Sequence, residues 1–209
     1  MIKIIDYKAG NAPSVFHAVD HLGHKAEFAK SPECLKGATH IILPGVGSAS
    51  ATMDSLKEMD LIPALEEAVL DKKIPFLGIC IGLQILFDYS EEDSTKCLGW
   101  LPGKVVKFDQ NKKDGKKIPV PQMGWNKVCF VKDTKVSARE DYFYFVNSYH
   151  AQADIGDIWG QSTYNGTFVG AVNRGNIYAT QFHVEKSGEA GLVMMDDFIK
   201  ITDMSSHSA

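Results

Sequence analysis

Residues 74–82 read Ile-Pro-Phe-Leu-Gly-Ile-Cys-Ile-Gly, and this stretch decides the fold class. Ile74 to Ile79 are nearly all apolar, as expected of a strand that is covered on both faces of a parallel sheet. Ile81 to Tyr89 have helical character, so the segment predicts a strand, a sharp turn and a helix, with Cys80 at the turn. Glycine lies two residues before and two residues after Cys80, where larger side chains would collide in a strained turn. We therefore expect the Cys80 thiol to point out of the sheet.

The N-terminal side of this stretch repeats the alternation of strand and helix. Short strands are predicted at Ile2–Ile5, Ala26–Ala29 and His40–Leu43, and helices at Pro13–Leu22, Ser50–Met59 and Ile62–Leu70. The turn-prone residues Lys8, Ala9, Gly10 and Asn11 connect the first strand to the first helix. Alternation of this kind through residue 90 predicts an α/β fold with an open, mostly parallel sheet flanked by helices.

The C-terminal half changes character and predicts antiparallel additions to that sheet. Strand-like runs occupy Val105–Phe108, Lys127–Val131, Tyr142–Val146, Phe168–Val172 and Ile177–Thr180, and a helix is expected over Glu189–Ile201. Asp-Gly inside the lysine-rich run 112–117 indicates a hairpin tip. The small polar tail, Met204 to Ala209, is expected to fray. With 209 residues and no linker, we expect one domain over 1–209.

Composition excludes several classes of protein. The net charge is -4 and charged residues make up 23%, so the chain lacks the basic excess that nucleic-acid binding needs. No stretch approaches the about 18 uninterrupted apolar residues of a membrane span, and the charged N-terminus does not resemble a signal peptide. The four cysteines match neither a zinc pattern nor a disulfide scaffold, so no metal and a reducing cytoplasm are expected.

Cys80 is the candidate nucleophile. At the first turn of a helix it would lie near unpaired N–H groups and the positive end of the helix dipole, which both favour thiolate over thiol. The backbone N–H of Ile81 would face the position where an oxyanion forms.

His183 is the best candidate for the proton carrier among seven histidines. It follows a predicted strand, so His183 and Glu185 would project from the same face and Glu185 could orient the ring. Nucleophile, base and orienting carboxylate then follow the logic of a catalytic triad. The alternative is an ordinary strand histidine beside a surface glutamate.

Other histidines are weaker candidates. His17, His21 and His24 share a helical spacing, but no carboxylate or cysteine completes a metal-binding set, which favours a solvated face. His150 follows Ser148 and Tyr149, where binding loops occur, but it has no carboxylate at triad spacing.

The segments around Cys80 and His183 together resemble the class I glutamine amidotransferases, whose triad is Cys, His and Glu in that order. These segments are GICIGLQ (Gly78 to Gln84) and QFHVEKSG (Gln181 to Gly188). Four further segments resemble one branch of that family, the glutaminase subunits of imidazole glycerol phosphate synthase. They are DYKAGN (Asp6 to Asn11), PGVG (Pro44 to Gly47), PQMGWN (Pro121 to Asn126) and FVNSYH (Phe145 to His150).

The resemblance implies a role for each matching residue. Cys80 would form a glutamyl thioester, with His183 as base and then acid, and Glu185 as its orienting partner. The implied further sites are an oxyanion hole at Val46, Gly47 and Ile81, substrate-binding positions at Gly45, Gln84, Ser148 and Tyr149, and a partner interface at Gln122, Trp125 and Asn126. In the family the PGVG loop is thought to reorient a peptide when the partner is occupied, and glycine makes such a change easy.

The resemblance also implies a substrate, a partner and no cofactor. Glutamine would be hydrolysed to glutamate and ammonia, and the ammonia would pass through a channel to a cyclase subunit of (β/α)8 type in a heterodimer of histidine biosynthesis. This chain departs from the family pattern at Val184, where proline is usual, at Gln122, where histidine is more common, and at Ala12.

Three alternatives remain open from the sequence. A paralogous subunit could feed ammonia to a sugar-modifying synthase, or the chain could be a catalytically silent scaffold. A cysteine peptidase or chaperone would share the turn around Cys80, but would not predict Gln84 or the PQMGWN segment. Trp125 on its own could equally be a buried aromatic side chain that packs on the core.

Overall fold

The structure is a computed structural model that describes residues 1–7, 11–111 and 117–202. The predicted turn at Lys8–Gly10, the hairpin tip at 112–116 and the tail from Met204 lie outside the described residues. None of the helices in the described part has the length and apolar character needed to cross a membrane.

The strands of the described residues form one sheet with the order β2-β1-β3-β4-β13-β12-β10-β7-β5-β6, to which β11, β8 and β9 are added beside β12. The parallel part contains β1 (Ile2–Ile5), β2 (Ala26–Ala29), β3 (His40–Gly45), β4 (Phe76–Cys80) and β13 (Ile177–Thr180). The remaining strands are β5 (Tyr89–Ser90), β6 (Thr95–Lys96), β7 (Gly103–Lys107), β8 (Gln122–Phe130), β9 (Asp141–Asn147), β10 (Tyr149–Ala153), β11 (Ile158–Thr163) and β12 (Thr167–Arg174). Apart from the parallel pair β5–β7, the pairings among these remaining strands are antiparallel.

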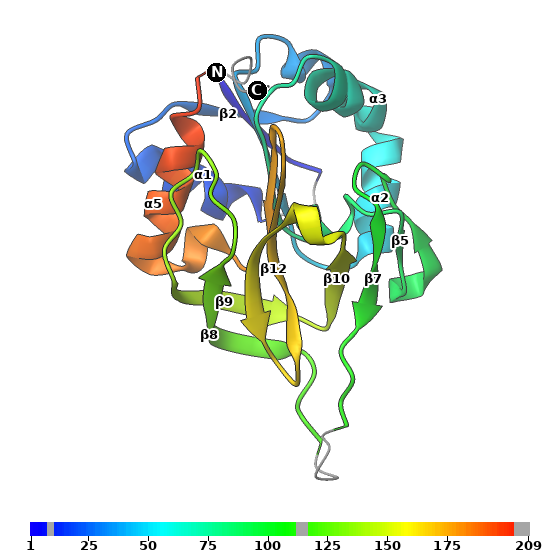
Figure 1. The fold of residues 1–209 in the computed structure, drawn as a ribbon. Coiled ribbons are helices and arrows are strands. Elements are labelled where there is room, and N and C mark those ends of the chain that lie inside the picture. The colour runs from blue at the N-terminus through cyan, green and yellow to red at the C-terminus, as the bar shows by residue number, and fades with distance from the viewer. Residues whose placement is uncertain (8–10, 112–116, 203–209) are drawn as a thin grey trace.

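Helices cover both faces of the parallel strands. Figure 1 shows α1 and α5 on one side of the sheet and α2 and α3 on the other. The helices are α1 (Ala12–His21), α2 (Ala49–Glu58), α3 (Leu61–Glu66), α4 (Ile81–Gln84) and α5 (Gly188–Ile199). Short 3-10 turns occupy Pro32–Leu35, Glu92–Ser94, Ile155–Asp157 and Val184–Lys186, and a π-helical turn, Glu67–Asp71, continues α3. This arrangement explains why every residue of β4 is buried.

The predicted fold class is confirmed, but the predicted length of one helix and the predicted pairing of one strand were wrong. The helix expected over Ile81–Tyr89 ends at Gln84. Beyond it the carbonyl groups of residues 85–87 accept hydrogen bonds from the backbone N–H groups of Leu98, Gly99 and Leu101 and not from a further helical turn. Ile177–Thr180 was expected to be an antiparallel addition, yet it pairs in parallel with β4 and antiparallel with β12. It therefore joins the two halves of the sheet beside Cys80.

Candidate active site

Cys80 lies at a strained turn between β4 and α4. Its φ of 57° and ψ of -103° are unusual for a residue with a side chain. A Cβ atom at Gly78 would lie 2.4 Å from the carbonyl oxygen of Gly82, and one at Gly82 would lie 2.1 Å from the carbonyl oxygen of Leu43. The predicted need for glycine on both sides of Cys80 is therefore confirmed. Because α4 is a single turn, its dipole favours the thiolate less than the predicted longer helix would.

His183 and Glu185 form the predicted pair, but not by the predicted geometry. His183 Nδ1 and Glu185 Oε1 are 2.9 Å apart, and both side chains are almost fully buried. The strand ends at Thr180, and His183 starts the 3-10 turn Val184–Lys186, so alternation along a strand was the wrong reason for this contact. A hydrogen bond from the backbone N–H of His183 to the carbonyl oxygen of Tyr144, 2.9 Å long, ties this turn to β9.

The pKa of His183 follows from its neighbours. Burial by itself lowers it, but hydrogen bonds with Cys80 and Glu185, together with their negative charges, outweigh burial and raise the pKa to about 10. Folding therefore favours the imidazolium. The stability that this interaction adds is fully present below the ordinary histidine pKa, and it is lost as the pH rises through about 10.

Changing Glu185 to glutamine should move the alkaline limit of activity. In the glutaminase reaction that the sequence motifs imply, a protonated His183 would give its proton to the leaving ammonia, so kcat for glutamate release should hold through neutral pH and fall as the pH approaches about 10. Glu185→Gln removes a charge that raises the pKa of His183. The pH at which activity is lost on the alkaline side should therefore fall by at least about one unit, and kcat should fall about 100-fold or more. The pH–rate profile of the complex measures both. Asp196→Asn, which removes a carboxylate from remote His24, is the control and should leave the alkaline limit of activity unchanged. An unchanged alkaline limit in Glu185→Gln would contradict the role given to Glu185.

A pocket of about 300 Å³ opens beside the Cys80 sulfur and brings most of the predicted site together. Its lining contains Cys80, His183, Val46, Gly47, Ile81, Gln84, Ser148 and Tyr149, together with Glu92, Pro121, Val146, Asn147 and Lys186. Glu185 lies behind His183. Gly45, Gln122, Trp125 and Asn126 are not part of the lining.

The two glycines of the PGVG segment have different structural roles. A Cβ atom at Gly45 would lie 2.7 Å from Ile81 Cβ and 2.8 Å from Tyr7 Oη, so Gly45 allows β3 to pack closely against the Cys80 turn. Gly47 has φ +100° and open space around it. Conformational freedom of the loop therefore belongs to Gly47, while Gly45 is required for packing.

Gln84 is buried beside the pocket, and its side-chain NH2 is already engaged. Nε2 donates to the carbonyl oxygen of Tyr149 at 3.1 Å and to Gln181 Oε1 at 3.1 Å. Its Oε1 has no hydrogen-bond partner among the described residues. The oxygen is therefore the atom that Gln84 can offer to a substrate.

The residues predicted at the partner interface separate into buried and exposed ones. Gln122 is only 3% exposed, because its position on β8 turns it inward, whereas Met123 and Trp125 point outward. A partner contact at Gln122 stays a prediction. Trp125 is 56% exposed, which excludes the buried alternative. The side chain of half-buried Asn126 donates to the carbonyl oxygen of Thr163 at 2.8 Å.

Four residues near the triad were not singled out from the sequence. Asn11 donates to Glu185 Oε1 at 3.0 Å, Gln181 Nε2 lies 3.8 Å from Cys80 Sγ, and Glu92 and Lys186 line the pocket. Asn11, Gln181 and Lys186 belong to segments that carry the family resemblance, so they could have been found. Nothing near Glu92 in the sequence signals its position.

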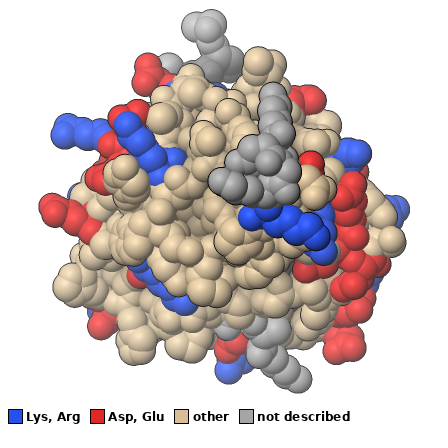
Figure 2. All heavy atoms as spheres, turned by 90° about the horizontal axis from the view of Figure 1, so that it is seen from below, with Lys and Arg blue, Asp and Glu red and all other residues tan. Residues whose placement is uncertain are grey.

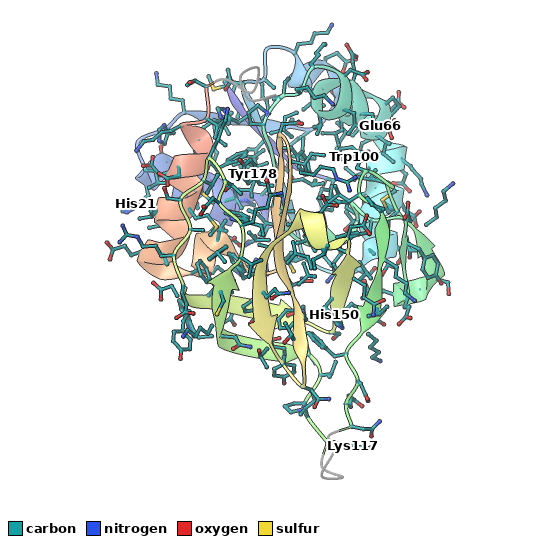
Figure 3. The ribbon with its side chains drawn as sticks, viewed as in Figure 1. His21, Glu66, Trp100, Lys117, His150 and Tyr178 are labelled. Atoms are coloured by element: carbon teal, nitrogen blue, oxygen red, sulfur yellow. The ribbon has the colours of Figure 1, made fainter. Side chains whose placement is uncertain are left out.

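Two other histidines considered from the sequence, His24 and His150, do not line the pocket. His24 lies beyond the end of α1 and pairs with Asp196 at 2.8 Å, so it does not share a solvated helix face with His17 and His21. His150 belongs to β10, as Figure 3 shows, and its ring stacks on Phe108 with centroids 4.6 Å apart. Burial lowers the pKa of His150, as expected of a core histidine.

An α/β sheet that carries a buried cysteine at a strand–helix turn, with a histidine–glutamate pair beside it, defines the class of this protein. The chain belongs to the class-I glutamine amidotransferase family, whose model matches residues 3–201. It is similar over nearly its whole length to proteins named imidazole glycerol phosphate synthase subunit HisH. The one from Leptospira interrogans is 39% identical and covers 96% of this chain and 100% of its own, and the one from Methanocaldococcus jannaschii is 42% identical with the same coverage. The resemblance drawn from the sequence motifs is thus confirmed.

Solved structures support the fold. A crystal structure of a glutamine amidotransferase superposes with a TM-score of 0.73 at 16% identity and covers 94% of this chain and 98% of its own. A chain from the structure of PurLQS from Thermotoga maritima gives a TM-score of 0.71 at 17% identity and covers 97% and 98%. At this identity the agreement concerns the fold alone.

Proposed function

We propose that this chain is the glutaminase subunit of an imidazole glycerol phosphate synthase, which hydrolyses glutamine and passes the ammonia to a cyclase subunit of (β/α)8 type. The observation that carries the proposal is the meeting of Cys80 and His183 in one pocket, with Glu185 bonded to His183, in a chain that is similar over nearly its whole length to HisH subunits. Its four cysteines are free thiols, which fits a reducing cytoplasm.

The triad performs the hydrolysis in two halves. The Cys80 thiolate attacks the side-chain carbonyl carbon of glutamine, and the proton of His183 goes to the departing ammonia, which leaves a glutamyl thioester. His183, now neutral, takes a proton from water as the water attacks the thioester. The sulfur then leaves as the thiolate, which restores the Cys80 thiolate and the His183 imidazolium, and the glutamic acid released loses its proton to solvent. Glu185 holds the ring and stabilises its charged form. One glutamine and one water give one glutamate and one ammonia.

The oxyanion of both steps needs donors beside the Cys80 sulfur. The backbone N–H of Ile81 is at the first position of α4, where the helix itself supplies no acceptor. A second donor comes from the Val46–Gly47 peptide once that peptide turns toward the sulfur, a change that the open space around Gly47 permits. The partner then controls turnover by favouring this loop conformation.

Two acceptors in the lining of the pocket suit the amino-acid end of glutamine. Glu92 offers a carboxylate and Gln84 Oε1 a buried oxygen without a partner, and both can accept N–H bonds from the α-ammonium group. Glu92 Oε2 also accepts from the backbone N–H of Ala49 at 2.7 Å, which fixes the carboxylate in place.

Replacing Glu92 by glutamine should weaken glutamine binding selectively. The amide oxygen can still accept from Ala49, but the charge that attracts the α-ammonium is lost. A charge-assisted hydrogen bond is worth about 1.5–3 kcal/mol, so KM for glutamine should rise about 10-fold or more while kcat changes less. Steady-state kinetics of the complex measure both. Asp93→Asn, at the exposed neighbour, should leave KM unchanged, and an equal KM in both variants would contradict the role of Glu92.

The partner is expected on the face formed by β8 and β9. Met123 is 67% exposed and Trp125 56%, and Trp125 packs against Tyr144 of β9 with ring centroids 6.0 Å apart. Figure 2 shows that uncharged side chains cover the middle of the lower face, where Figure 1 places these strands, and that charged side chains lie toward its rim. An apolar centre with a polar rim is typical of protein interfaces.

Trp125→Ala should weaken the complex. An exposed tryptophan at the centre of an interface contributes about 2 kcal/mol or more, so the Kd for the cyclase should rise about 30-fold or more. Calorimetric titration measures the Kd, and stimulation of glutaminase activity should need correspondingly more cyclase. Val193→Ala, at an exposed apolar side chain of α5, is the control and should bind normally. A Trp125→Ala protein with normal affinity would place the interface elsewhere.

Co-purification with the encoded synthases, followed by glutamate assays, tests the whole proposal. The expected result is weak glutamate release by the chain alone and strong release when the cyclase and its nucleotide substrate are added. Stimulation by a sugar-modifying synthase and not by the cyclase would instead identify a paralogous subunit.

A further inference from the structure

A chain of two buried amides leads from the pocket to the Cys80 sulfur. Gln84 Nε2 donates to Gln181 Oε1 at 3.1 Å, and Gln181 Nε2 lies 3.8 Å from Cys80 Sγ. Gln84 is 2% exposed and Gln181 is completely buried. The mechanism above gives Gln181 no role, although its side chain touches the nucleophile.

The carbonyl group of Tyr149 sets which atom donates in each hydrogen bond of these two amides. Its carbonyl oxygen, 3.1 Å from Gln84 Nε2, can only accept, so Gln84 must turn its NH2 group toward it. The same NH2 group also meets Gln181, which must therefore present its oxygen. The NH2 group of Gln181 is left to face the sulfur, so Cys80 meets a donor and not an acceptor.

A donor at this position favours the reactive form of cysteine. Only a protonated thiol can donate to the carbonyl oxygen of Val146, 3.9 Å from Sγ, whereas the N–H of Gln181 interacts best with the thiolate. The thiolate is the nucleophile. Val146 and Gln181 therefore act in opposite directions on the same atom, and the hold of Gln84 on Gln181 decides whether the donor stays in place.

We propose that Gln181, held by Gln84 and the Tyr149 carbonyl, is a positioning residue that keeps an N–H donor against the Cys80 sulfur and stabilises the thiolate. The proposal rests on the glutaminase function above but concerns the ionisation of the free enzyme.

Alkylation of Cys80 by iodoacetamide as a function of pH measures that ionisation without glutamine or partner. Mass spectrometry of the Cys80 peptide separates it from the other cysteines. In Gln181→Leu the midpoint of the alkylation profile should rise by about one pH unit, because the donor is lost. In Gln181→Glu it should rise further, since a carboxylate then faces the sulfur, while Gln84 keeps its acceptor. The other titratable groups around the thiol, His183, Tyr7, Glu92 and Lys186, are the same in all variants.

Gln84→Leu tests whether the hydrogen bond from Gln84 keeps Gln181 in its orientation. It leaves Gln181 free to turn, so the midpoint should rise by less than in Gln181→Leu. The matched control is Thr180→Val: Thr180 is equally buried, but its hydroxyl donates to the carbonyl oxygen of Phe182 at 2.8 Å and not to the sulfur. Its midpoint should equal that of the wild type.

The outcomes separate this proposal from the proposed function. An unchanged midpoint in folded Gln181→Leu or in Gln181→Glu overturns the role of Gln181, and an unchanged midpoint in Gln84→Leu overturns the hold of Gln84. If Gln181→Leu does not fold, Gln181→Glu, which preserves the contact with Gln84, decides alone. Failure of the wild type to release glutamate with the cyclase would sink the glutaminase function and leave the alkylation result intact.

Discussion

Cys80→Ala is expected to abolish glutamine-dependent synthesis while the complex still forms and still uses ammonia. The thioester cannot form without the sulfur, and removal of a triad nucleophile costs about 10⁴-fold or more in kcat. Cys80 is 4% exposed and lines the pocket, whereas Met123 and Trp125, which are proposed to bind the cyclase, do not line it. Glutamate release and product formation, measured with glutamine or with ammonium chloride, give the two activities.

The comparison of the two nitrogen sources makes this prediction selective. Loss of both activities would indicate that the variant no longer folds or no longer binds the cyclase, and Cys97→Ala, at another buried free cysteine, shows the cost of removing a thiol from the core. Full glutamine-dependent synthesis by Cys80→Ala would mean that the chain is a scaffold and that its triad is idle.

The turn around Cys80 could be predicted from the sequence because its causes are local. An apolar strand and two glycines at fixed distances from Cys80 are sufficient, and the close approaches at Gly78 and Gly82 show why. The predicted helix failed beyond Gln84 for a non-local reason. The carbonyl groups that follow it accept hydrogen bonds from Leu98, Gly99 and Leu101, a contact that no periodicity in residues 81–89 reveals.

The His183–Glu185 pair shows that a correct pair can be predicted by an incorrect geometry. A spacing of two suggests a strand, but a 3-10 turn also allows His183 and Glu185 to meet. Asn11 lies far away in the sequence and holds the same carboxylate, so only the packing of α1 against this turn reveals its role. The role of Glu92 is likewise visible only in the packed structure, where the backbone N–H of Ala49 at the N-terminus of α2 fixes its carboxylate.

The segment PQMGWN shows why the residues predicted at the partner interface differ in exposure. In the structure it begins β8, so successive side chains alternate between the core and the outside. Alternation places Trp125 outside and Gln122 inside, where both polar atoms of its side chain lack a partner among the described residues. The departure from the family pattern at Gln122 therefore concerns a buried side chain.

Gly82→Ala should be among the most destabilising single substitutions in this chain. A Cβ atom there would lie 2.1 Å from the carbonyl oxygen of Leu43, a backbone atom of β3 that cannot move without breaking the sheet beside Cys80. Overpacking of this kind costs about 3 kcal/mol or more, and α4 would have to move away from β3. Urea denaturation measures the free energy of unfolding, and thiol alkylation reports whether Cys80 keeps its environment. Gly156→Ala is the matched control, because a Cβ atom there meets nothing within 4 Å and should change stability by less than about 0.5 kcal/mol. If both variants unfold at the same urea concentration as the wild type, α4 does not need the close approach to β3, and glycine at 82 must be explained by the chemistry of the site.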